Sequence, residues 1–230
     1  MQKESIQEKI WESDFGRKYT KRNTFDSYAI WNKSYIKKFG VSKDYINKEF
    51  LQKLPKEIKI LEIGCNIGNQ LNCLKKMGFK DLSGIDIQQN CLTKIKKNFN
   101  NIKVVSASAY NLPFKKNSFD FVFTSNVLIH FPPNKINKVF DEIYRISSKW
   151  IWGFEYFSNK FEEIIYRKNK DLLWKTDYTE LFLKRFKNLD LEKEKFYRNI
   201  SNHKEIDTMF LLKKKKQYID KGIHVLKKYN

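Results

Sequence analysis

The sequence lacks the signals that would place the chain in a membrane or outside the cell. No apolar run approaches the roughly 18–20 residues that a membrane-spanning helix requires. The first residues, MQKESIQEKIWESDFG, are polar and contain no apolar core of a secretory signal. Glycine (8) and proline (4) are scarce among the 230 residues and form no linker, so one domain is expected. We therefore expect a cytoplasmic protein with no membrane insertion.

Cysteine is also scarce, and the number and spacing of the cysteines argue against a disulfide framework and against a metal site. The three cysteines, Cys65, Cys73 and Cys91, are odd in number and have none of the spacings typical of a metal site. We predict reduced thiols, which are usual in the cytosol, and no bound metal.

Acidic residues are in the minority, with 26 Asp and Glu against 46 Lys and Arg, for a net charge of +20. A charge of this sign raises the possibility of a nucleic-acid partner. Lysine is spread along the whole chain together with Asn and Ile, and all three have A/T-rich codons, so genome composition explains the charge more simply. The one dense cluster is Lys213–Lys216, which remains a candidate anion patch. We expect no nucleic-acid partner and a monomer or a homodimer.

The order of apolar runs indicates an α/β fold. Five runs alternate with helical patterns, which predicts βαβ units and a mostly parallel, Rossmann-like sheet. The predicted strands of this part are Ile58–Ile63, Leu82–Asp86, Ile102–Ser106, Phe119–Ser125 and Trp150–Tyr156. Two more strands, Leu189–Tyr197 and Asp207–Lys213, have no helix between them, which predicts an antiparallel last strand and an antiparallel edge.

Helical patterns surround this core. Trp11, Phe15 and Tyr19 recur every four residues, which places three aromatic rings on one helix face. We expect three parts of one domain: an N-terminal helical cap or lid (1–55), a Rossmann-like core (56–214) and a basic C-terminal helix (215–230). Further helices are expected at Ser27–Phe39, Ser42–Leu54, Asn69–Met77, Gln89–Asn98, Asn134–Ser147, Phe161–Lys168 and Tyr178–Phe186.

The most informative segment is IKILEIGCNIGNQLN (58–72). An apolar run meets a turn bounded by Gly64 and Gly68, and a helix follows, which is typical of a nucleotide-binding fold. The middle glycine of the dinucleotide fingerprint is replaced by Asn66, which tolerates a left-handed backbone but serves a pyrophosphate less well. Glu62, just before the turn, would repel a pyrophosphate and suits an amine.

A second carboxylate, Asp86, ends the next predicted strand about 20 residues on, where a ribose-binding acid belongs. The two acids and the altered turn favour a cofactor with an adenosine, an amino group and no phosphate. S-adenosylmethionine is such a molecule.

These motifs resemble the class I S-adenosylmethionine-dependent methyltransferases. The resemblance rests on LEIGCNIGNQL (61–71), GIDI (84–87), ASAYNLPF (107–114) and FDFVFTSNVLIHF (119–131). It implies an enzyme that leaves S-adenosylhomocysteine as product. It also implies that the cofactor is held by Glu62, Gly64, Asn66, Gly68, Asp86, Ile87, Ser108, Ala109 and Asn126. An Asp commonly stands where this chain has Ser108, beside the adenine.

A narrower resemblance covers WESDFGRKYTKRN (11–23) together with TSNVLIHFPP (124–133). Both segments are similar to methyltransferases associated with pseudaminic acid biosynthesis clusters. That resemblance implies a lid with a Tyr-x-x-Arg-Asn element, here Tyr19, Arg22 and Asn23. Arg22 would clamp the cofactor carboxylate, and Trp11 and Tyr19 would cover the cofactor, although these rings could instead dock the helix onto the core.

The acceptor is expected near the carboxyl ends of the fourth and fifth strands. His130 follows the fourth strand, and a histidine pKa near neutrality suits a general base; a structural role is the alternative. Glu155 ends the fifth strand and could bind an acceptor amine or hydroxyl. Tyr110, Tyr156 and Phe157 are expected to bind substrate, with core packing as the alternative.

The leading hypothesis is therefore a small-molecule methyltransferase whose acceptor is a sugar or nucleotide sugar of surface-glycan metabolism. An RNA, DNA or protein methyltransferase that uses the basic surface is the first alternative. A nicotinamide dehydrogenase is disfavoured by the missing middle glycine. A non-catalytic protein that binds S-adenosylmethionine remains open.

Overall fold

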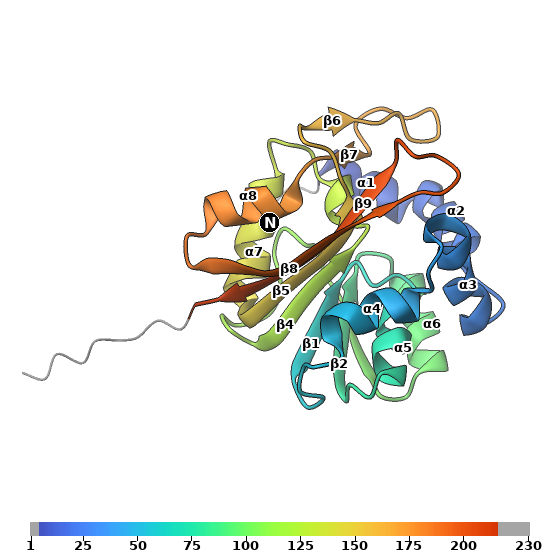
Figure 1. The fold of residues 1–230 in the computed structure, drawn as a ribbon. Helices are drawn as coiled ribbons and strands as arrows, with labels where there is room; N and C mark the ends of the chain where they lie inside the picture. The colour runs from blue at the N-terminus through green and yellow to red at the C-terminus, as the bar shows by residue number, and fades with distance from the viewer. Residues whose placement is uncertain (1–4, 216–230) are drawn as a thin grey trace, which may run out of the picture.

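The computed structural model describes residues 5–215. Its main sheet has seven strands in the order β3-β2-β1-β4-β5-β9-β8. β1 to β5 pair in parallel, while β9 is antiparallel to both β5 and β8 (Figure 1). The strands are β1 (Lys59–Ile63), β2 (Asp81–Asp86), β3 (Ile102–Ser106), β4 (Phe119–Ser125), β5 (Ser147–Tyr156), β8 (Leu189–Arg198) and β9 (Ile206–Lys214). The predicted Rossmann-like sheet with an antiparallel last strand is confirmed, and β9 lies inside the sheet with β8 at its edge.

Helices cover both faces of the sheet, and each face has its own apolar core. α4 (Lys43–Leu51), α5 (Asn69–Lys76) and α6 (Gln89–Asn98) pack on one face. α7 (Ile136–Ile146) and α8 (Tyr178–Arg185) pack on the other, as Figure 1 shows. The apolar stripe of α7 recurs every three or four residues, as a helix that buries one face requires.

Three helices precede α4 in the described chain: α1 (Ile6–Glu12), α2 (Asp14–Arg22) and α3 (Tyr28–Phe39). The sequence predicts one helix through Trp11 and Tyr19, but the structure breaks it at Ser13, whose side chain accepts the N–H of Phe15 and so caps α2. The three aromatic rings still meet, with the Trp11 centroid 5.3 Å from that of Phe15 and 5.1 Å from that of Tyr19. We call α1 and α2 the N-terminal lid.

The predicted helix at Phe161–Lys168 is wrong. This segment forms part of a small hairpin, in which β6 (Glu162–Glu163) pairs antiparallel with β7 (Trp174–Lys175). A tight turn brings Tyr166 and Asn169 together, and its two central residues have φ angles of 52° and 68°. Both central residues are left-handed, as in a type I′ turn.

The predicted basic helix at the C-terminus lies outside residues 5–215 apart from its first residue, Lys215. Within residues 5–215, no helix combines the length and the apolar character needed to cross a membrane.

Candidate functional site

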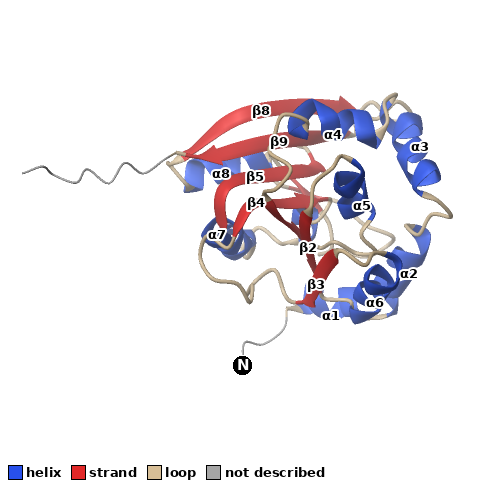
Figure 2. Cartoon of the chain, turned by 90° about the horizontal axis from the view of Figure 1, so that it is seen from below, coloured by secondary structure: helices blue, strands red, loops and turns tan. Residues whose placement is uncertain are grey.

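A cavity lies at the carboxyl ends of β1, β2 and β4, under the N-terminal lid. Seen from below in Figure 2, α1 and α2 lie beside α6 and the edge strand β3. The residues that line the cavity come on one side from the sheet and its loops and on the other from helices at the start of the chain. Ten residues predicted from the sequence line it: Trp11, Tyr19, Glu62, Gly64, Asn66, Asp86, Ile87, Ala109, Asn126 and His130.

The turn after β1 forms the floor of the cavity. Gly64, Asn66 and Gly68 all have positive φ angles, of 71°, 45° and 82°. The predicted left-handed conformation of Asn66 is confirmed, and the Asn66 side chain accepts the N–H of Ile67 within the turn. A side chain at Gly64 would approach Val127 to 2.6 Å, so glycine is required there for contact with the loop after β4 as well as for backbone conformation. Gly68 caps α5 and does not line the cavity.

Two buried carboxylates flank this turn. Asp86 accepts the backbone N–H of Asn66 at 2.8 Å and that of Gln88 at 2.9 Å, which fixes both of its oxygens at the end of β2. Burial raises its pKa, while those N–H groups act in the opposite direction. Glu62 is 4% exposed, and burial raises its pKa well above the usual range, opposed chiefly by the ammonium of Lys43.

The cavity wall carries polar atoms that have no partner. Within residues 5–215, these buried atoms are Gln7 Oε1, Trp11 Nε1, Glu62 Oε2, Asn126 Oδ1 and both amide atoms of Gln70. Buried polar groups are normally hydrogen-bonded, so this concentration in one cavity points to a ligand with both donors and acceptors. An adenosyl amino acid, with an amine, a carboxylate, ribose hydroxyls and a base, has that chemistry.

The lid is tied to the rest of the site by side-chain hydrogen bonds. Asn66 donates from Nδ2 to Thr20 Oγ1 at 3.0 Å, which joins α2 to the turn. Trp11 lies against the ring of His130, with centroids 4.3 Å apart. Arg22 is exposed and outside the cavity, and its guanidinium lies 6.0 Å from the Tyr19 ring centroid. The structure thus places Trp11 and Tyr19 where the sequence predicts them, but not Arg22.

His130 lies on the short helix η1 (Leu128–His130) and lines the cavity. Its Nδ1 is 2.8 Å from the carbonyl oxygen of Leu172, so Nδ1 donates and Nε2 carries the lone pair in the neutral ring. Burial lowers its pKa to about 4. The expected pKa near neutrality is therefore wrong, because the ring is desolvated with no carboxylate bonded to it.

Glu155 does not line the cavity. It is fully buried in β5, and its carboxylate accepts the backbone N–H of Val127 at 2.9 Å. Burial raises its pKa to about 8 in spite of that bond and the other donors near it. Glu155 therefore holds the loop that carries Asn126 and His130, and its contact with an acceptor stays a prediction.

The other predicted residues lie around the cavity, not in its wall. Ser108 is engaged with the lid, because its hydroxyl donates to Glu8. Tyr110 is buried in the loop after β3, with its ring 5.2 Å from that of Phe131. Tyr156 and Phe157 follow one another at the end of β5; Lys38 Nζ lies 4.9 Å from the Tyr156 ring centroid, and Phe157 packs on Phe196. None of the last three lines the cavity, so their substrate contacts remain a prediction.

Known proteins match the core that carries this cavity. Residues 60–149 match a family model described as a methyltransferase domain. A demethylmenaquinone methyltransferase from Staphylococcus aureus (strain MRSA252) is 29% identical over 117 residues, which cover 47% of this chain and 43% of that protein. This chain spans less than half the length of the first curated relatives that it matches.

Solved structures share the fold over a longer span. A Pyrococcus horikoshii OT3 protein matches with a TM-score of 0.66 at 18% identity, over 88% of this chain and 99% of that one. An S-adenosylmethionine-dependent methyltransferase from Methanosarcina mazei matches with a TM-score of 0.57 at 15% identity, over 70% and 94%. Residues 60–149 are thus similar to a methyltransferase domain. The Methanosarcina mazei neighbour is S-adenosylmethionine-dependent, and the unpartnered atoms of the cavity have the donors and acceptors that this molecule would need.

Sequence reasoning missed several residues that line the cavity. The cavity is also lined by Gln7, Glu8, Phe25, Trp31, Tyr35, Gln70, Gln88 and Phe131, among others. Gln70 had a signal, since it lies in the first turn of the helix that follows the glycine turn. Trp31 and Tyr35 lie one turn apart on α3, and that helical spacing was the only sign in the sequence that they share a face. Ser5 and Glu8 form a capping box, which marks a helix start but gives no hint of a ligand.

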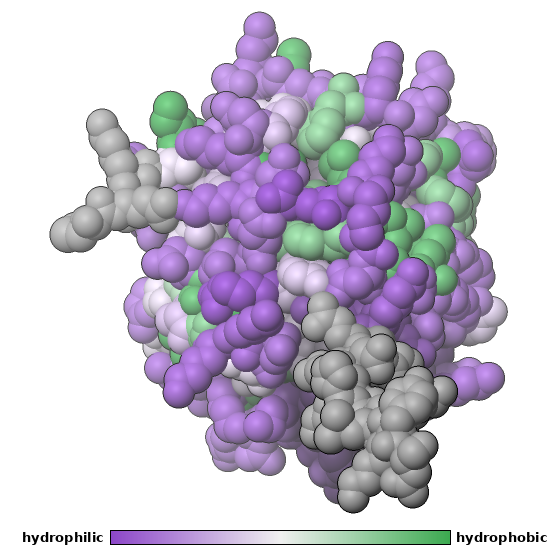
Figure 3. Space-filling view, turned by 90° about the vertical axis from the view of Figure 1, so that its left-hand side faces the viewer, coloured by the Kyte–Doolittle hydropathy of each residue, from purple (hydrophilic) through white to green (hydrophobic). Residues whose placement is uncertain are grey.

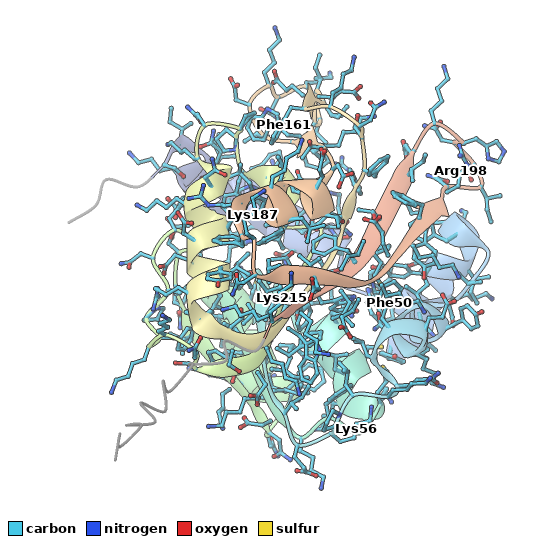
Figure 4. All side chains as sticks on the ribbon, turned by 60° about the vertical axis from the view of Figure 1, so that its left-hand side comes forward. Phe50, Lys56, Phe161, Lys187, Arg198 and Lys215 are labelled. Carbon is cyan, nitrogen blue, oxygen red and sulfur yellow. The ribbon has the colours of Figure 1, made fainter. Side chains whose placement is uncertain are left out.

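The described residues of the basic cluster Lys213–Lys216 pair with groups of this chain. Lys213 pairs with Glu192 at 3.2 Å and Lys215 with Asp190 at 3.1 Å. Lys214 donates to the backbone oxygens of Tyr144 and Ser147, and burial lowers its pKa to about 8. Figure 4 shows Lys215 near Lys187 on the side of α8 and β8, and Figure 3 shows that much of this side is hydrophilic. Each described lysine of the cluster therefore has a partner on this chain.

Proposed function

We propose that this protein transfers a methyl group from S-adenosylmethionine to a small-molecule acceptor of the sugar or nucleotide-sugar class. The cavity carries the proposal. It brings the carboxylates of Glu62 and Asp86 and unpartnered amide groups together at the carboxyl ends of parallel strands, where ligands of α/β folds bind.

Each end of the cofactor finds a matching group on this chain. Glu62 would accept hydrogen bonds from the amino group at Oε2, the atom that has no partner in residues 5–215. Gln70, in the first turn of α5, has a free Nε2 donor for the carboxylate. Asp86 would accept from the ribose hydroxyls, because each of its oxygens has spare lone pairs beyond the backbone bonds described above.

The bound cofactor supplies an electrophilic methyl group, so the protein must align the acceptor and exclude water. Trp11, Tyr19 and His130 form a contiguous aromatic wall over the cavity. Neutral His130 offers a lone pair at Nε2, which can accept a hydrogen bond from an acceptor hydroxyl and orient it. With a pKa of about 4, it is a weak base near neutral pH.

Two observations support a small acceptor. The lid covers the cavity with packed aromatic rings, which leaves little room for a macromolecular substrate. The partial relative from Staphylococcus aureus is named for a small-molecule substrate, demethylmenaquinone. The sugar class rests on the resemblance of residues 11–23 and 124–133 to pseudaminic acid cluster methyltransferases, since no geometry selects it.

The experiment is a turnover assay with two readouts. Purified protein is mixed with S-adenosylmethionine and panels of nucleotide sugars, free sugars and quinols, with total RNA as a separate arm. We expect S-adenosylhomocysteine to form together with a sugar product heavier by one methyl group. Turnover confined to quinols would refute the acceptor class, turnover on RNA would establish the first alternative, and cofactor binding without turnover on any arm would favour a non-catalytic protein.

A further inference from the structure

The wall of the cavity beside β3 is built partly by the lid. A cofactor whose ribose is held by Asp86, with its amino acid end at the glycine turn, extends its base away from that turn toward β3. There the cavity is lined by small and apolar residues of the core, Ile87, Ala107 and Ala109, and by Gln7 and Glu8 of α1. The core residues offer flat apolar contact for a base, and α1 adds the polar side chains.

Ser108 is not free to bind the base as the sequence predicts. Its hydroxyl donates its single hydrogen to Glu8 Oε1, and its oxygen accepts the N–H of Tyr110 at 3.1 Å. The serine therefore serves to hold a carboxylate from the lid. The carboxylate of Glu8 therefore lies near the position where related proteins commonly carry an Asp, but it is supplied by α1 and not by the loop after β3.

Glu8 is fixed in this position from both sides. Its Oε2 accepts the backbone N–H of Ser5 at 2.8 Å, and its own N–H is accepted by Ser5 Oγ at 3.1 Å. This reciprocal capping box starts α1, and Ser108 holds the other oxygen. The carboxylate keeps further lone pairs for a donor in the cavity.

The neighbouring Gln7 supplies an independent observation. Its side chain is 8% exposed, and its Nε2 donates to the backbone oxygen of Asp171 at 3.3 Å. That bond orients the amide, and Oε1 is left buried with no partner in residues 5–215. Two consecutive residues of α1 thus present acceptor oxygens and no donor at this end of the cavity.

We propose that Glu8, with Gln7 beside it, binds the exocyclic amine of the adenine and so selects for adenine. This inference rests on the proposed function, since it assigns a part of the same cofactor site. The amine has two N–H donors, which match the two acceptors. A base with a carbonyl oxygen in place of the amine would face two acceptor oxygens and be rejected. The lid is then part of the cofactor site, so the base can be bound fully only when α1 is in place.

The test compares S-adenosylhomocysteine with S-inosylhomocysteine, which carries a carbonyl in place of the amine, by titration calorimetry on the full chain. The wild-type protein should prefer the adenine ligand by about tenfold or more. Glu8→Gln keeps the capping box, because glutamine also serves at that position. It adds a donor, so the preference should fall about tenfold.

Two control variants separate this role from a structural one. Ser5→Ala loosens α1 but keeps the Glu8 carboxylate, so it should weaken the adenine ligand without strengthening binding of the inosine ligand, unlike Glu8→Gln. Asp14→Asn removes an exposed lid carboxylate that pairs with Arg17, and it should change neither affinity. An unchanged preference in Glu8→Gln would overturn the inference and leave the proposed function intact. No binding of S-adenosylhomocysteine to the wild-type protein would instead refute the proposed function.

Discussion

Glu62→Gln should stabilise the free protein and weaken cofactor binding at the same time. The buried carboxylate has one oxygen without a partner in residues 5–215, and burial raises its pKa well above the usual range. A group of this kind costs stability in the free protein, because its charge is desolvated and incompletely compensated. The amide keeps the shape of the side chain and has no charge.

The sign of the pH dependence follows from the raised pKa. The folded protein holds the Glu62 proton more tightly than the unfolded chain does, so wild-type stability falls as pH rises above the unfolded pKa of about 4.3. The Glu62→Gln protein has no carboxyl group at this position, so it does not lose this stability as pH rises. Its advantage should therefore be small near pH 4 and grow with pH to about 1–3 kcal/mol, the cost of a buried group without its partner.

The cofactor should respond in the opposite direction. Losing a charge-assisted hydrogen bond to the amino group costs about 1.5–3 kcal/mol, or about 10- to 150-fold in the Kd for S-adenosylhomocysteine. Urea unfolding from pH 4 to 9 and calorimetry at pH 7.5 measure the two effects. The matched control is Glu57→Gln, an exposed glutamate just before β1 that pairs with Lys80, and it should change neither quantity. A less stable Glu62→Gln protein with unchanged affinity would refute the reasoning.

Three further results are expected. Gly64→Ala should lower the free energy of unfolding in urea by about 2–4 kcal/mol, because the new side chain meets a left-handed φ and approaches Val127 to 2.6 Å. Gly78→Ala is the control, also left-handed but with nothing nearer than 4.0 Å, and it should lose about 1–2 kcal/mol. Equal losses in the two variants would exclude the steric contact with Val127. The free energy of unfolding of the wild type, measured relative to His130→Gln, should fall by up to about 3 kcal/mol between pH 6.5 and pH 4. The reason is that His130, with a pKa of about 4, stays neutral in the folded protein while the histidine of the unfolded chain is protonated. A difference that does not change with pH would show that His130 has an ordinary pKa. Arg22→Ala should leave calorimetric affinity for S-adenosylhomocysteine unchanged, because the exposed side chain is outside the cavity, and a tenfold loss would restore the predicted clamp.

The parallel core could be predicted because its signals are local. Apolar runs such as Phe119–Ser125 match β4, and the helix predicted at Gln89–Asn98 matches α6. The turn from β1 to α5 was predicted from its two glycines and from the tolerance of asparagine for a left-handed backbone. The hairpin of β6 and β7 was missed because its left-handed turn uses Arg167 and Lys168, where Asn-Gly would have been the usual signal.

The site was predictable only where one short segment carries it. Asp86 and Glu62 lie in strands that define the fold, so their placement followed from the fold. The hydrogen bond from Ser108 to Glu8 joins residues 100 positions apart, and no local sequence pattern predicts it. Burial of Glu155 and His130 also depends on what packs around them, which explains why one was expected to face an acceptor and the other to titrate near neutrality.

Direct binding of the cofactor product tests the central claim best. Titration calorimetry of the full chain with S-adenosylhomocysteine should show one molecule bound per chain, and Asp86→Ala should weaken that binding by at least about tenfold, because it removes the charged acceptor for the ribose. Absence of binding to the wild-type protein, or unchanged affinity in Asp86→Ala, would contradict the assignment of this cavity as the S-adenosylmethionine site.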